Sequence, residues 1–166
     1  MAEIIPDQIL DAALKETADF SDDETRMEIH RISIVQPALV TYFTVMIEDS
    51  SESVQGFALA MFIAIHKVFE KQFGMFQKVG TKRVEEIANR NEQGMIYVRI
   101  RQPEEAYLSA FMASSVSQPS LLAYVFKSIC TPGEDVPELS EVQQDGLMII
   151  MKTVIDVLDS AVHANR

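Results

Sequence analysis

The sequence predicts an all-α protein of roughly eight helices, arranged as a bundle or an αα-superhelix within one domain spanning residues 1–166. Three observations indicate this class. Glycine and proline occur only six times each, whereas residues that favour helices are abundant. Apolar residues recur at helical spacing along most of the chain. The run FALAMFIAI at residues 57–65 is apolar all round, which is typical of a helix buried at the centre of a domain.

Four helices are predicted in the first half of the chain, at about residues 7–20, 22–35, 37–49 and 52–73. Ser21 precedes three acidic residues, and Glu24 lies three positions after it, so the second helix should begin with a capping box. Pro37 disfavours helical backbone before it and separates the second helix from the third. Either Ser51 or Ser53 should cap the fourth helix, around which the others are expected to pack.

Four more helices are predicted in the second half, at about residues 81–93, 104–117, 119–130 and 140–163. The stretch TPGEDVPEL at 131–139 predicts a surface loop, because it combines Pro, Gly and acidic residues. The stretch MIYVRIR at 95–101 is β-branched and partly alternating, so local propensity predicts a strand. A single strand has no partner in a helical chain. An extended connector, a continuation of the preceding helix and a strand paired across a dimer axis therefore stay open.

Two segments 82 residues apart share Ser, Gln, Pro, Leu and Tyr at the same spacing: SIVQPALVTY at 33–42 and SVSQPSLLAY at 115–124. This match predicts an internal duplication of a four-helix unit, with pseudo-repeats at about 7–80 and 81–163. The alternative is that two unrelated helices both begin at a proline. In a duplication, helices 52–73 and 140–163 occupy equivalent places. The first should be the more buried, because the second carries Lys152 and Asp156.

Composition narrows the classes of function. The formal net charge of −11 opposes binding to nucleic acid or to anionic membranes. Cys130 is the single cysteine, so no intrachain disulfide forms. The chain starts Met-Ala-Glu, which is acidic where a signal peptide is basic, and the nine-residue apolar run is too short for a membrane span. We therefore expect a cytoplasmic protein.

One segment departs from the acidic character of the chain. Residues 66–101 hold eight basic and four acidic residues, so their net charge is +4 and that of the rest is −15. The candidate binding residues of this basic strip are Lys78, Lys82, Arg83, Arg90, Arg99 and Arg101. Such a strip suits an acidic protein partner, a phosphorylated ligand or the acidic face of a second copy. The alternative is a solvated helix face.

No catalytic or cofactor motif is present: the chain has no Gly-rich phosphate loop, nucleophile elbow, Cys pair or His-Glu-x-x-His. His66 and Glu70 have the i, i+4 spacing of a metal pair, but the further ligands of a metal site are missing, so neither a metal nor a cofactor is predicted.

Gln and Tyr are the polar residues that both copies of the repeat retain, as Gln36 and Gln118 and as Tyr42 and Tyr124. They suggest either two equivalent pockets or a structural role. In the structural interpretation, which we favour, Gln pairs backbone groups freed at the proline break and Tyr packs with its hydroxyl at the rim.

These observations predict a non-catalytic helical module for protein interaction or scaffolding, which binds a protein partner or itself, with a homodimer as one form. The alternative is a regulatory domain that binds a small molecule in an apolar pocket between the two halves. An enzyme of unfamiliar type, using groups such as His66 and Glu70, is the third hypothesis.

Overall fold

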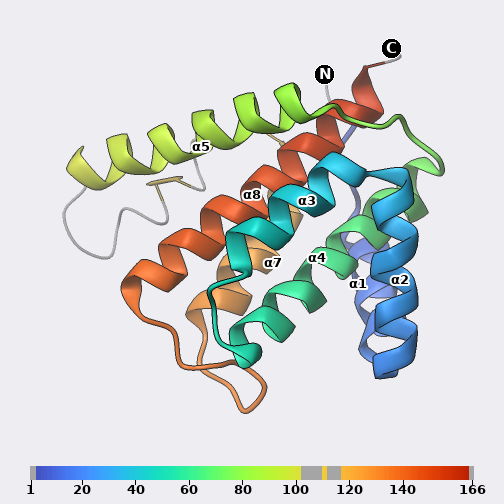
Figure 1. Cartoon of the computed structure of the whole chain (residues 1–166), viewed down its shortest axis with the longest axis horizontal. Coiled ribbons are helices and arrows are strands. Elements are labelled where there is room, and N and C mark those ends of the chain that lie inside the picture. The colour runs from blue at the N-terminus through green and yellow to red at the C-terminus, as the bar shows by residue number, and fades with distance from the viewer. Residues whose placement is uncertain (1–2, 102–109, 112–116, 165–166) are drawn as a thin grey trace.

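The computed structural model describes residues 3–101, 110–111 and 117–164 (Figure 1). Within them the chain forms seven helices and no strand, which confirms the all-α prediction. The helices are α1 (Asp7–Ala18), α2 (Asp22–Val35), α3 (Pro37–Ile47), α4 (Glu52–Phe73), α5 (Thr81–Arg101), α7 (Pro119–Cys130) and α8 (Glu141–His163). The helix predicted at 104–117 lies mostly outside the described residues.

Side-chain caps fix several of these boundaries. Ser21 accepts a hydrogen bond from the backbone of Glu24, whose carboxylate accepts one from Ser21 in return, so the predicted capping box is present. Ser140 and Gln143 form the same arrangement at the start of α8. Ser51, and not Ser53, caps α4. Residues 131–139 contain no helix, as predicted for a loop.

Helices α4 and α8 pack against each other through the middle of the molecule (Figure 1). Helix α1 lies against α4, α5 lies along α8, and α2 packs on α3. By length and composition α4 is the one described helix that suits a membrane span. However, 56% of its most apolar window is buried inside the protein, as in the core helix of a soluble protein.

The expectation that α4 is more buried than α8 is wrong. Ten of the 22 residues of α4 are buried, against 13 of the 23 in α8. Helices α3, α4, α5 and α7 all contact α8, so they cover it on several sides. Lys152 and Asp156 do not hold α8 at the surface, because they bind each other inside the protein.

The strand that local propensity favours at 95–101 is absent: α5 continues without a break to Arg101, which is the helical continuation that the sequence left open. The buried face of α5 begins with Val84, Ile87 and Asn91. Met95 and Val98 extend it at helical spacing along α8. Arg99 adds an ion pair to Asp145 of α8 at 2.5 Å. Packing along α8 therefore overrides the local β-propensity of this stretch.

Candidate functional site

The six candidate residues of the basic strip divide between the two ends of α5. Lys78, Lys82 and Arg83 lie exposed at its start, whereas Arg99 and Arg101 lie about 25–30 Å away at its end, given the rise of an α-helix. Arg90 lies between the two groups and contacts Asp156 of α8 at 3.7 Å.

At the far end of α5, Arg99 binds both Asp145 and Glu141 of α8, at 2.5 and 3.4 Å. The guanidinium of Arg101 lies 4.6 Å above the ring of Tyr97. Arg90 and Arg99 therefore help to join α5 to α8. The group at the start of α5 is the part of the strip that borders a groove.

This groove runs between α3 and the first turns of α5, and we call it the α3/α5 groove. Its larger part has a volume of about 660 Å³. A second part, of about 500 Å³, shares Tyr42, Met46 and Glu85 with the first and extends the groove towards Gly146 and Ile149 of α8. Its apolar walls are formed by Ala38, Tyr42, Val45, Met46, Val79, Val84 and Ile149.

Charge differs along the α3/α5 groove. Lys78 lines the end where α3 and α5 both begin, and the first turn of α5 carries no acidic residue to offset the positive end of the helix dipole. Glu85 and Glu92 line the part farther along α5. The groove therefore has a positive end, and acidic residues border its apolar walls from Glu85 onward.

Gln36 holds this end of the groove together. Its buried amide donates to the carbonyl of Gln77 at 2.7 Å and accepts from the N–H of Val79 at 3.1 Å. These two bonds fix the extended segment before α5 against the start of α3. Since Pro37 occupies the first position of α3, both helices begin at the same point.

Gln118 makes the same pair of bonds in another place. Its buried amide donates to the carbonyl of Glu3 and accepts from the N–H of Ile5, both at 2.8 Å. The expectation that these glutamines pair backbone groups at the proline break is wrong, because each one binds a segment distant in sequence.

Tyr42 and Tyr124 both line pockets, and the hydroxyl of Tyr42 is buried, not at the rim as expected. Burial raises the pKa of both tyrosines. Tyr124 lies in a pocket of about 520 Å³ between α1, α2 and α4, which includes Gly56 and Leu59.

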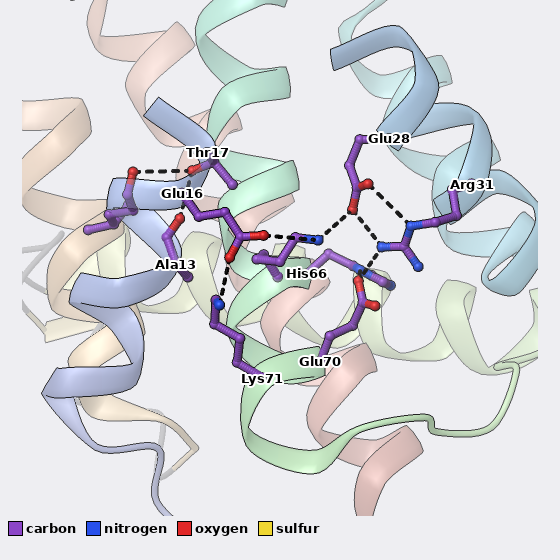
Figure 2. A network of polar contacts seen from close by, with 10 residues as sticks. Ala13, Glu16, Thr17, Glu28, Arg31, His66, Glu70 and Lys71 are labelled. Atoms are coloured by element: carbon purple, nitrogen blue, oxygen red, sulfur yellow. Dashed lines mark hydrogen bonds and ion pairs between the residues drawn. The ribbon is translucent and has the colours of Figure 1, made fainter. Parts of the chain in front are cut away.

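A polar network joins α1, α2 and α4 (Figure 2). Its ion pairs link Glu16 with Lys67 and Lys71, Glu28 with Lys67 and Arg31, and Glu70 with Arg31 and His66. Burial alone would raise the pKa of Glu70, but hydrogen bonds from His66 and Arg31, with their charges, lower it to about 2. The network therefore keeps Glu70 ionised.

His66 is buried, with its Nδ1 2.8 Å from the carboxylate of Glu70 and its ring beside Phe76. It is therefore an interior residue. Among the described residues, no three His, Cys, Asp or Glu side chains lie close enough together to hold a metal ion. In this arrangement His66 and Glu70 act as a pair that joins α4 to Arg31 of α2.

A second polar cluster is buried between α5 and α8. The ammonium of Lys152 donates to Asn91 at 2.7 Å and to Asp156 at 2.8 Å, and Asn91 donates to Asp156 at 3.1 Å. Ser117 donates to the other oxygen of Asp156 at 2.7 Å. The spacing of Lys152 and Asp156 on one apolar helix was the sequence signal for this cluster, although their charges alone predicted a less buried helix.

Apolar side chains are also exposed at the end of α5, where Ile96, Tyr97 and Ile100 face solvent.

No protein-family model, curated protein or solved structure matches this chain. Its function is therefore inferred from the surfaces and clusters described above.

Proposed function

We propose that this protein is a non-catalytic helical interaction module that binds a protein through the α3/α5 groove. The observation that carries the proposal is the exposure of Val45 and Met46, at 55% and 48%, on the wall of an open apolar groove. Exposed apolar groups that line a concave surface gain free energy when a partner covers them, on the order of 1 kcal/mol for each half-exposed side chain.

The polar clusters support a role without catalysis. His66 and Glu70 are engaged with Arg31, and Lys152 and Asp156 are engaged with Asn91. Both clusters join helices and lie outside the groove. The groove itself offers apolar walls bordered by Lys78, Glu85 and Glu92, which suits recognition of a partner whose apolar face carries charges of both signs.

We further propose that the chain is an internal duplication with pseudo-repeats at about 7–80 and 81–163. Gln36 and Gln118 support it, because each binds a carbonyl and an N–H two residues apart in the segment that precedes α5 or α1. Tyr42 and Tyr124 line pockets together with Gly146 and Gly56, respectively. The packing of α1 on α4 and of α5 on α8 fits the same relation.

A second candidate function is the binding of a small molecule in the same groove. In the proposed duplication the groove lies between the two halves, since α3 belongs to the first and α5 to the second. Its volume of about 660 Å³ suits a ligand of ordinary size. An apolar ligand with an anionic group would place that group near Lys78. The exposure of Val45 and Met46 favours the larger, protein partner.

Photo-crosslinking tests the proposal. A photoreactive residue is placed at Val45 in the full chain, and a matched one at Ile100, which is 80% exposed on the same molecule. The proposal predicts a protein adduct from position 45 in cells, and little from position 100. A small added mass in native mass spectrometry of the wild type would favour the second candidate. Equal crosslinking at both positions would overturn a role specific to the groove.

A further inference from the structure

Helix α2 carries an apolar stripe on its solvent side. Asp23, Met27, His30 and Ile34 follow one another at intervals of four, three and four residues, which places them on one face of a helix. Met27 is 72% exposed and Ile34 is 59% exposed. The buried Ile32 lies on a different face of α2, and α2 packs on α3. Its outer stripe therefore has two apolar anchors that nothing in the described chain covers.

The spacing of this stripe matches the wall of the α3/α5 groove. Met27 and Ile34 are seven residues apart, or about 10 Å along a helix. On the groove wall, Ala38, Tyr42 and Val45 also span seven residues of α3. A helix that lies in a groove inserts anchors at such intervals. The two apolar anchors of the stripe are therefore as far apart as the two ends of this part of the wall.

Charge gives the direction of docking. Helix α2 begins with Asp22, Asp23 and Glu24, all exposed. The α3/α5 groove begins at Lys78 and the start of α5, where Lys82 and Arg83 are also exposed. Pairing the acidic start of α2 with this basic end places the docked helix roughly parallel to α3 and α5, with Met27 and Ile34 over the apolar walls.

We propose that α2 of a second copy of this chain docks in the α3/α5 groove. The proposal rests on the proposed function and names the partner: the chain itself, in a homodimer. Every copy carries both the stripe and the groove, and α2 and α3 meet at Gln36. A two-fold dimer therefore forms the contact twice, since each α2 enters the groove of the other copy.

The net charge of the chain opposes self-association, and the local charges of the proposed contact act against this repulsion. The chain has a formal net charge of −11, so two copies repel each other over most of their surfaces. Contact between the acidic start of α2 and the basic end of the groove is favourable in spite of this repulsion. Raising the ionic strength weakens both effects, while the apolar contacts of Met27 and Ile34 remain.

Sedimentation equilibrium on the full chain tests the proposal with three variants. Met27→Glu replaces an apolar anchor of the stripe with a charge, and Val45→Glu does the same on the wall of the groove. Ile100→Glu is a control at an exposed helix position outside both surfaces. All three residues are exposed, so thermal unfolding should show each variant folded. We expect a wild-type dimer, with its dissociation constant raised at least about tenfold by Met27→Glu or Val45→Glu and little changed by Ile100→Glu.

Mixing the two damaged variants gives a sharper result. Met27→Glu keeps an intact groove and Val45→Glu keeps an intact stripe, so the mixture forms a heterodimer through one contact although neither variant dimerises well alone. A wild-type monomer at the highest soluble concentration, a dimer insensitive to Met27→Glu, or one weakened by Ile100→Glu would overturn the inference. In those cases a crosslink from Val45 to another protein still supports the proposed function, so the two failures are distinguishable.

Discussion

At the scale of single residues, two buried glutamines fix where extended segments meet helix starts. Gln118 pairs the backbone of Glu3 and Ile5 and also donates to Asp159 at 2.7 Å. A buried N–H or carbonyl that loses its partner keeps its full desolvation cost. These side chains therefore contribute more than a hydrogen bond at the surface.

The variant Gln118→Ala tests this contribution. We expect the free energy of unfolding to fall by about 1–3 kcal/mol, because the buried N–H of Ile5 and the partly buried carbonyl of Glu3 lose their partner. Gln93→Ala, on the exposed side of α5, is the matched control and should change stability by less than about 0.5 kcal/mol. Urea denaturation of the full chain measures both. Equal effects of the two changes would show that the buried bonds contribute nothing specific.

Glu70 makes stability depend on pH. Its pKa is about 2 in the folded protein and near its ordinary value of 4.5 in the unfolded chain. A lowered folded pKa contributes stability above the unfolded value, and this contribution is lost as pH falls from about 4.5 to about 2. Glu70→Gln should therefore cost on the order of 1–2 kcal/mol at neutral pH, after allowance for its partial exposure.

The measurement for Glu70 is the free energy of unfolding of wild type and Glu70→Gln over this range of pH. The difference between the two proteins should shrink as pH falls below the unfolded pKa. The control, Glu24→Gln, removes an exposed carboxylate outside this network, and Gln can still accept the capping-box hydrogen bond from Ser21. A difference between wild type and Glu70→Gln that stays constant down to the lowest pH would contradict the account.

At the scale of elements, the joint between α5 and α8 combines an apolar stripe with a buried ion pair. Lys152 and Asp156 are both nearly inaccessible, and Asn91 of α5 binds both of them. The two charges balance each other within α8, and the hydrogen bonds of Asn91 join this pair to α5. Removal of one charge leaves the other buried and unpaired.

Asp156→Ala should therefore lower the free energy of unfolding by about 3–5 kcal/mol, more than the loss of its hydrogen bonds alone. The double variant Lys152→Met and Asp156→Leu should recover most of this loss, because neither charge remains. Thermal or urea unfolding of the single and double variants measures the difference. A double variant that is less stable than Asp156→Ala would show that the pair is not the source of the cost.

The sequence predicted the helices well where local signals act. The caps at Ser21 and Ser51, and the break at Pro37, depend on chemistry within a few residues, so they could be found without the fold. The sequence left the state of the stretch 95–101 open, because its helical conformation depends on contacts of Met95, Val98 and Arg99 with a helix about 50 residues later.

The candidate site was predicted less well for the same reason. The basic strip was evident in the sequence as a run of charges. In the structure, however, Lys78 and Arg99 lie at opposite ends of α5, and Arg99 forms an ion pair with α8. The groove itself left no local signal, since it arises where α3 and α5 lie side by side. The equal spacing of Gln and Tyr in the two repeat segments was the one sequence feature that pointed to pockets.

At the scale of the whole molecule, one acidic chain carries a stripe with two apolar anchors on α2 and an apolar groove beside α3. Methionines mark both surfaces: Met27 lies on the stripe and Met46 lines the groove. Met75, in the connector before α5, is fully exposed and belongs to neither surface. Met61 and Met151 are buried in the core. Met27 and Met46 therefore report on the two surfaces, and the other three methionines serve as controls.

The rate at which peroxide oxidises each methionine tests whether a second copy covers the stripe and the groove. Peptide mass spectrometry measures these rates at low and high protein concentration. Oxidation of Met27 and Met46 should slow as the protein assembles. Oxidation of the exposed Met75 should stay fast, and that of the buried Met61 and Met151 should stay slow. If Met27 and Met46 keep the same rates relative to Met75 at every concentration, these surfaces are not covered by a second copy, and the claim is contradicted.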